Sequence, residues 1–145
     1  MSDTNNITKV TPVRIVDRIE PCLPFWCEGL GYQQRAAVPH EGALGFVLLE
    51  NAAGEIMLQT KDSLAADMAR VAKVEPHTVL FIEVASLEKA RRSVGGARVL
   101  VEDRTTFYGM REMVVVDPVG TVIVFAEKVA AQQAASASVR SGADS

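Results

Sequence analysis

The stretch "VDPVGTVIVFAEK", Val116 to Lys128, joins a tight turn to a strand whose centre contains nothing that can ionise. Pro118 fixes φ at the first turn position, and Gly120 accepts conformations that a side chain would resist. The segment from Thr121 to Phe125 is β-branched and aromatic, which predicts a strand covered on both faces. A ligand bound beside this strand would therefore meet Val and Phe side chains.

The order of elements that leads to this strand occurs twice in the chain. Hydrophobic alternation and turn signals predict a strand, a helix and three strands in each half. The first half contains 10–16, 20–31, 32–38, 44–50 and 55–60, and the second contains 78–84, 86–94, 95–102, 110–117 and 121–127. A repeat of this length indicates two copies of one supersecondary unit. Since neither copy has enough core by itself, we expect the two to complete one structure.

The first helix, "EPCLPFWCEGL", contains two prolines. Asp17 and Glu20 have capping-box spacing, which predicts that the helix begins there. Pro24 cannot donate the backbone hydrogen bond that a regular helix requires. We therefore expect an irregular helix that ends at Gly29 or Gly31.

Serine residues precede the other two predicted helices. Ser63 is the predicted N-cap of a short helix around 63–72, and Ser86 is the predicted N-cap of 86–94. Pro76 separates the two halves. Both serines have the side-chain oxygen that satisfies a free N–H group at a helix start.

Composition limits the class of partner. The chain has 145 residues, 48% of them hydrophobic, and a formal net charge of −3. Its basic residues form no stripe, which argues against nucleic-acid and membrane-surface binding. No apolar run approaches the roughly 18 residues of a membrane span, and no secretory leader is recognisable. We expect a cytoplasmic protein whose cysteines, Cys22 and Cys27, are free thiols, and whose partner is a small molecule or another protein chain.

Two segments resemble the vicinal oxygen chelate superfamily, in its glyoxalase-like and bleomycin-resistance-like branch. "TPVRIVDRIEPCLPFWCEGLGY" is similar to the first strand, helix and exit of that family, and "TTFYGMREMVVVDPVGTVIVF" is similar to its ending. The resemblance implies an α+β fold of two βαβββ modules in tandem, which form a cup-shaped, mostly antiparallel sheet pair, often within a homodimer. Residues 1–128 would then form one domain of modules at about 7–61 and 77–128, followed by a flexible tail at 129–145.

Enzymes of this superfamily hold a divalent metal with four side chains, one from the first and one from the fourth strand of each module. The resemblance places these positions at Thr11, at Met57 (or its neighbours Leu58 or Gln59), at Val79 and at Val124. None of these is a usual ligand of zinc, iron or manganese. The expectation is therefore no metal and no cofactor.

The two histidines do not replace the missing ligands. His77 lies two residues before Val79 and could supply one ligand under a shifted alignment, although a residue next to Pro76 is more typical of a loop or strand end. His40, in "PHEG", is either a rim residue that responds to pH or a solvated turn residue.

What remains is an apolar surface with a few polar groups, as in many small-molecule sites. We expect ligand contacts from Thr11, Val13, Met57, Gln59, Phe81, Glu83, Tyr108, Arg111 and Val124. Ile15, Val79 and Val122 share the same alternation. Tyr108 with Arg111 would offer an aromatic face and a planar donor group; alternatively, Arg111 pairs with Glu112 or Asp103 in a surface loop.

Three hypotheses follow for the function. The first is a metal-free protein that binds or sequesters a hydrophobic or planar ligand in the cup or in a dimer cleft. The second is a metal-dependent lyase, isomerase or dioxygenase with atypical ligands. The third is a dimerisation or scaffold module whose interior is filled by its own side chains. The missing ligands favour the first.

Overall fold

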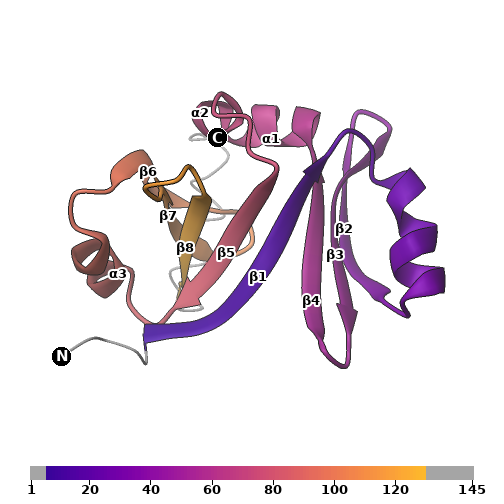
Figure 1. Cartoon of the computed structure of the whole chain (residues 1–145), viewed down its shortest axis with the longest axis horizontal. Coiled ribbons are helices and arrows are strands. Elements are labelled where there is room, and N and C mark those ends of the chain that lie inside the picture. Colours follow the sequence, from indigo (N-terminus) through magenta and orange to yellow (C-terminus); the bar gives the residue numbers. More distant parts are fainter. Residues whose placement is uncertain (1–5, 130–145) are drawn as a thin grey trace. The chain divides into compact units, whose positions relative to one another are not determined.

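The computed structural model describes residues 6–129, which form two compact units (Figure 1). One unit contains Thr11–Val79, and the other contains the chain up to Val10 together with the residues from Leu80 onward. The predicted order of strand, helix and three strands is present twice. The tail predicted for 129–145 lies outside the described residues, apart from Val129.

The unit of Thr11–Val79 is built on four strands. They are β1 (Ile7–Val16), which begins just before the unit, β2 (Gln33–His40), β3 (Ala43–Asn51) and β4 (Gly54–Thr60). Their order is β2-β3-β4-β1, with antiparallel pairing from β2 to β4. β1 is parallel to β4, and Val13 pairs with Met57. Two short helices, α1 (Lys61–Asp67) and α2 (Ala69–Ala72), follow β4.

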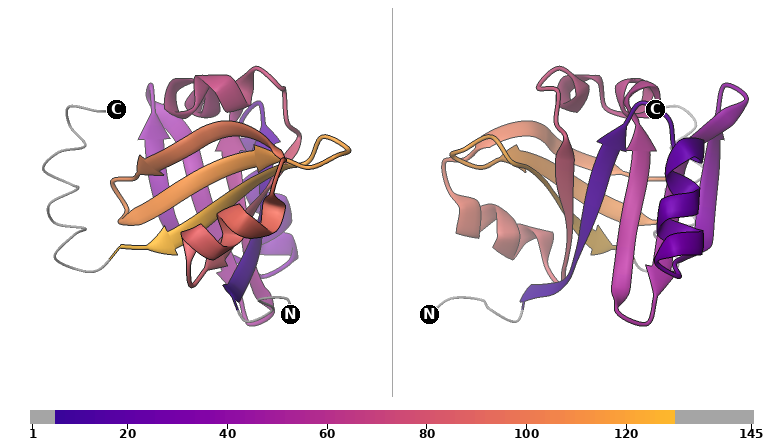
Figure 2. Two further views of the ribbon diagram at one scale, coloured as in Figure 1. Left: turned by 90° about the vertical axis from the view of Figure 1, so that its left-hand side faces the viewer. Right: turned by 45° about the vertical axis from the view of Figure 1, so that its right-hand side comes forward.

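A helical segment covers one face of these strands (Figure 2, right). It consists of the 3₁₀-helix η2 (Glu20–Cys22) and the π-helix η3 (Pro24–Gly29), so the predicted irregular helix is confirmed. Buried Ile19 packs with Val47, Leu49 and Leu58, and Trp26 packs against this cluster. Val47 and Leu49 both point to this face because alternate residues of a strand share one face.

Two predicted helix starts are corrected. The first helix has Ile19 at its N-cap, which offers no side-chain bond; the Glu20 carboxylate instead accepts the Leu44 N–H at 2.8 Å. This backbone donor lowers the pKa of Glu20. The helix α1 begins two residues before Ser63, and its N-cap is Thr60, whose hydroxyl accepts the Ser63 N–H at 3.1 Å. The last residue of a strand thus also caps the helix that follows.

Gly45 is buried in β3 where a side chain has no room. A Cβ atom built there would lie 2.5 Å from the Cβ of His40 and 3.1 Å from the Cβ of Ser63. Neither atom can move away by side-chain rotation, because a Cβ is fixed by its backbone. This position therefore requires glycine for close packing of β2 and α1.

The second unit repeats the same arrangement. It contains β5 (Thr78–Val84, whose first two residues precede the unit boundary), α3 (Leu87–Val94), β6 (Arg98–Thr105), β7 (Met110–Val116) and β8 (Val122–Lys128). The order is β5-β8-β7-β6, which matches that of the first unit, strand for strand. β6 to β8 pair antiparallel. The α+β class, the two βαβββ modules and the mostly antiparallel strands are therefore confirmed.

The helix α3 covers one face of these strands (Figure 2, left). Leu87 and Ala90 pack on Ile82, Met113 and Phe125. The predicted cap is confirmed, since the Ser86 hydroxyl accepts the Lys89 N–H at 3.2 Å. None of the helices within residues 6–129 is long and apolar enough to cross a membrane.

The turn before β8 is also as predicted. Asp117 accepts the N–H groups of Thr121 and Val119 at 2.8 and 3.0 Å. These bonds, with Thr121 first, lower the pKa of Asp117. Gly120 has φ of 92°, a conformation that few side chains tolerate.

Candidate functional site

In the first unit, the predicted ligand contacts share the sheet face that the helices leave uncovered. Val16 packs with the helical segment, so alternation places Val13 and Thr11 on the opposite face. Met57 and Gln59 pair with Val13 and Ile15 and lie on that same face. Thr11 and Val13 are buried, whereas Met57 and Gln59 are half-buried.

The polar groups on this face already have contacts. The hydroxyl of Thr11 donates to Glu55 Oε1 at 3.4 Å, and Gln59 Nε2 donates to Ser63 Oγ at 3.3 Å. The neighbours Phe46 and Leu48 pair with Gln59 and Met57. The face is therefore mainly apolar, with satisfied polar groups at its margins.

In the second unit, Phe81, Glu83 and Val124 lie on the face opposite α3. The residues that pack on α3 include Ile82, Val84 and Phe125, so the intervening residues point the other way. Val124 pairs with Val114, and both are buried. Phe81 and Glu83 are half-buried. In each unit these predicted contacts on the strands therefore share one face, while ligand contact stays a prediction.

A buried carboxylate lies on this same face of the second unit. Glu112, in β7, is 0% exposed. Its Oε1 accepts from Arg104 Nε at 3.0 Å, and its Oε2 accepts from the Tyr108 hydroxyl at 2.5 Å. Hydrogen bonds of this kind to a charged group are stronger than neutral ones. Glu112, Arg104 and Tyr108 form what we call the Glu112 cluster.

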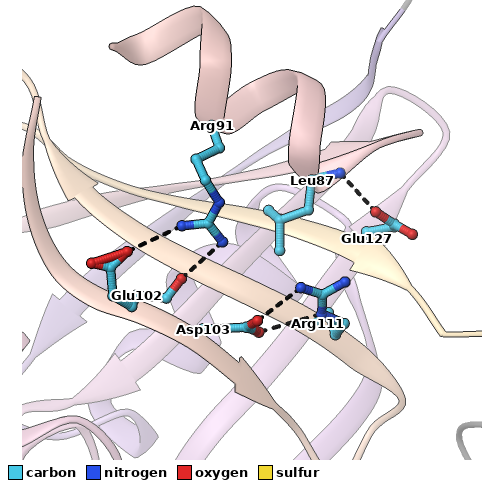
Figure 3. Close-up of polar contacts among 6 residues, drawn as sticks. All are labelled: Leu87, Arg91, Glu102, Asp103, Arg111 and Glu127. Carbon is cyan, nitrogen blue, oxygen red and sulfur yellow. Dashed lines mark hydrogen bonds and ion pairs between the residues drawn. The ribbon is translucent and has the colours of Figure 1, made fainter. Parts of the chain in front are cut away.

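Arg111 lies on the other face of β7 and does not join Tyr108. Figure 3 shows its guanidinium beside Asp103, with Arg111 Nη2 at 2.7 Å from Asp103 Oδ2 and a second bond from Nε at 3.3 Å. The Asp103 partner raises the pKa of Arg111. Arg91 of α3 contacts Glu102 next to this pair. Of the two alternatives for Arg111, the structure shows the ion pair with Asp103.

The hairpin between β6 and β7 presents two aromatic rings. Phe107 is 69% exposed and Tyr108 is 49% exposed, and their rings meet edge to face with centroids 5.1 Å apart. Thr106 fixes the turn, because its backbone N–H donates to Met110 O and its hydroxyl accepts the Met110 N–H. Together with the hydrogen bond to Glu112, this turn holds the Tyr108 ring in one place.

The four positions that correspond to the superfamily's metal ligands do not fit a metal ion. Thr11, Val79 and Val124 are buried, and Met57 offers only a thioether. Across residues 6–129, no group of three or more His, Cys, Asp or Glu side chains is arranged to hold a metal. Hard and borderline cations need several oxygen or nitrogen donors at once.

The histidines lie apart from these positions. His77 precedes β5, and its carbonyl accepts the Ile15 N–H at 2.8 Å and Arg14 Nη1 at 2.9 Å. His77 is therefore a strand-end residue, the second of the two roles considered for it. His40 is the last residue of β2, with its Nε2 3.8 Å from Glu41 Oε2.

Glu112 was not predicted to be a site residue and was expected only as a possible partner of Arg111. The sequence did contain a signal for it. Glu112 is the one acidic residue of "MREMVVV" and, two residues before Val114, lies on the same face of the strand. A charged residue at an inward position of a buried strand is costly unless it is paired. This inward position could have identified Glu112 as a site residue.

Comparison with known proteins identifies the fold. No protein-family model and no curated protein sequence matches the chain. A glyoxalase/bleomycin resistance protein/dioxygenase superfamily member from Vibrio splendidus is similar, with a TM-score of 0.62 and 17% identity over 83% of this chain and 98% of that chain. Methylmalonyl-CoA epimerase from Mycobacterium tuberculosis is also similar, with a TM-score of 0.64 and 20% identity over 93% of this chain and 97% of that chain.

The methylmalonyl-CoA epimerase of Streptomyces coelicolor gives a TM-score of 0.57 at 17% identity, over 86% of this chain and 96% of that chain. These similarities show that the chain has the fold of the glyoxalase/bleomycin resistance/dioxygenase superfamily. The resemblance seen in the motifs is thus confirmed at the level of the fold. Because many functions share one fold, the site must indicate the function.

Proposed function

We propose that this chain is a metal-free small-molecule-binding protein of the glyoxalase/bleomycin-resistance type. Its ligand is hydrophobic or planar and binds against the sheet faces that the helices leave uncovered. The observation that carries the proposal is the chemistry of Thr11, Met57, Val79 and Val124, which offer no donor set for a cation. Binding energy then comes from burial of apolar surface and from aromatic contact.

The Glu112 cluster gives the uncovered face of the second unit a fixed polar feature. Burying an ion pair costs desolvation energy that well-packed apolar residues would avoid. In the proposed function that cost is offset because the cluster holds the Tyr108 ring in place at the hairpin. A pre-organised ring loses less entropy when a planar ligand stacks on it.

Titration with the uncharged fluorescent probe N-phenyl-1-naphthylamine tests the proposal. We expect saturable binding that neither EDTA nor added Zn²⁺ changes. Phe81→Ala should weaken it at least tenfold, because Phe81 lies on the uncovered face. Phe25→Ala is the matched control, since Phe25 is 64% exposed on η3 and should leave the affinity unchanged. No saturable binding, or binding that requires a metal, would contradict the proposal and favour the scaffold or enzyme hypothesis.

We also propose a cytoplasmic homodimer. The strands β1 and β5 are not open edges, because the Ile15 N–H donates to His77 O and the Ala85 N–H donates to Asn6 O. The terminal strand of the first unit's order is β2, and all of its residues except His40 are exposed. An exposed edge strand is a surface on which a second copy can pack. Light scattering across a concentration series would decide, and a monomer at micromolar concentration would refute the dimer.

A further inference from the structure

A small cavity lies where β5 and β8 end, within the second unit, which also contains the chain up to Val10. Its volume is about 240 Å³, and it is lined by Thr8, Glu83, Ala85, Ala126, Glu127 and Lys128. The volume equals that of roughly eight water molecules, at about 30 Å³ each. A ligand of roughly eight or nine non-hydrogen atoms would fill it.

Two of the three charged side chains at this cavity have no partner among residues 6–129. Glu127 is engaged, because its Oε1 accepts the Leu87 N–H at 2.7 Å (Figure 3). Glu83 and Lys128, by contrast, form no side-chain hydrogen bond or ion pair with any residue from Asn6 to Val129. They line one cavity and yet do not pair with each other.

This arrangement is unusual for Glu83, because its side chain is half-buried. A carboxylate that loses solvent without gaining a partner costs free energy. Lys128 is exposed and carries the opposite charge. Two separate, unpaired charges of opposite sign at one cavity are complementary to a molecule that itself carries both charges.

The other lining groups suit such a ligand. The Thr8 hydroxyl donates to the Glu83 carbonyl at 3.2 Å, so its oxygen can still accept from a ligand ammonium. Ala85 and Ala126 are small and apolar, and of the two Ala85 is exposed. They leave room for an aliphatic group between the two charges.

We propose that this cavity binds a small zwitterion of the α-amino acid type. The ligand's ammonium contacts Glu83 and its carboxylate contacts Lys128, while an aliphatic side chain lies against Ala85. Glu83 lies on the uncovered face that the proposed function uses, but this site needs neither the Glu112 cluster nor a planar ligand. Free amino acids with aliphatic side chains match its size and charge.

Three probes of one shape test this site: L-leucine, 4-methylpentanoate, which lacks the ammonium, and 3-methylbutylamine, which lacks the carboxylate. Amide resonances of Ala85 and Lys128 are followed by NMR during titration of the full chain. We expect saturable shifts with L-leucine and at least tenfold weaker binding of the other two probes.

Two variants assign each charge to its partner. Glu83→Gln should weaken L-leucine at least fivefold and leave 4-methylpentanoate unchanged. Lys128→Gln should weaken L-leucine similarly and leave 3-methylbutylamine unchanged. Glu28→Gln is the control, because Glu28 is exposed on η3 and does not line the cavity. Equal affinity of wild type for all three probes, or equal loss of all three in Glu83→Gln, would overturn the proposal. Binding of N-phenyl-1-naphthylamine to wild type is measured separately, so the two proposals can fail separately.

Discussion

The two tyrosines of the chain allow a test of the Glu112 cluster by removal of one hydroxyl at a time. Tyr108→Phe removes the donor that lies 2.5 Å from Oε2 of a carboxylate that is 0% exposed. A hydrogen bond to a charged group contributes about 1.5–3 kcal/mol. The remaining ring is unchanged, so packing with Phe107 is kept. We expect a loss in the free energy of unfolding of about 1.5–3 kcal/mol.

Tyr32→Phe is the matched control. The Tyr32 hydroxyl has no hydrogen bond within residues 6–129, and its ring meets Trp26 edge to face at 5.5 Å. Its loss should change the free energy of unfolding by less than about 0.5 kcal/mol. Urea denaturation followed by far-UV circular dichroism measures both variants, and Tyr108→Phe should also lower Tm by about 5–12 °C for a chain of this size.

Equal stability of the two variants would refute the reasoning. It would mean that the Tyr108 hydroxyl does not hold Glu112 in solution. The ring would then be no better fixed than any exposed tyrosine, and the proposed stacking surface would lose its pre-organisation.

Three further predictions concern packing, pH and the central strand. Gly45→Ala should cost about 1–3 kcal/mol through its steric contacts, whereas Gly96→Ala, with open space around it, should be nearly neutral in the same denaturation assay. Asp117 has a lowered pKa in the folded state, so its charge stabilises the fold above its unfolded pKa. The advantage of wild type over Asp117→Asn in thermal melts should therefore hold at pH 7 and shrink below about pH 4. Val124 is 3% exposed, so Val124→Glu should cost several kcal/mol, more than about 2 kcal/mol beyond Val124→Thr. That result would remove Val124 from the expected ligand contacts, whereas equal costs would indicate that a ligand or solvent reaches this strand.

The faces of the strands were predictable from the sequence because side chains alternate with a period of two. Val13 and Met57 therefore share a face, as do Phe81 and Val124, without any knowledge of the loops. Helix starts were less predictable, since Thr60 and Ser63 can both cap a helix and only the end of β4 selects Thr60. Both residues take part in the cap, because the Thr60 hydroxyl accepts the backbone N–H of Ser63.

The Glu112 cluster was not predictable because it depends on strand register. β6 was expected to end at Glu102, but it continues to Thr105, and Arg104 then lies opposite Glu112. Two irregularities, between Val99 and Val101 and between Val101 and Arg104, set this pairing. Bulges shift a strand by one residue and leave no clear pattern in a single sequence.

Metal analysis of the purified chain tests most directly whether the protein is metal-free, as the proposed function requires. The protein is purified without chelator, dialysed against zinc, iron, nickel and manganese in turn, and measured by elemental analysis. We predict well under one equivalent of each metal, because Thr11, Met57, Val79 and Val124 offer no donor set. Near-stoichiometric metal that is lost in His77→Ala would contradict this prediction and would indicate a metal enzyme whose ligands include His77.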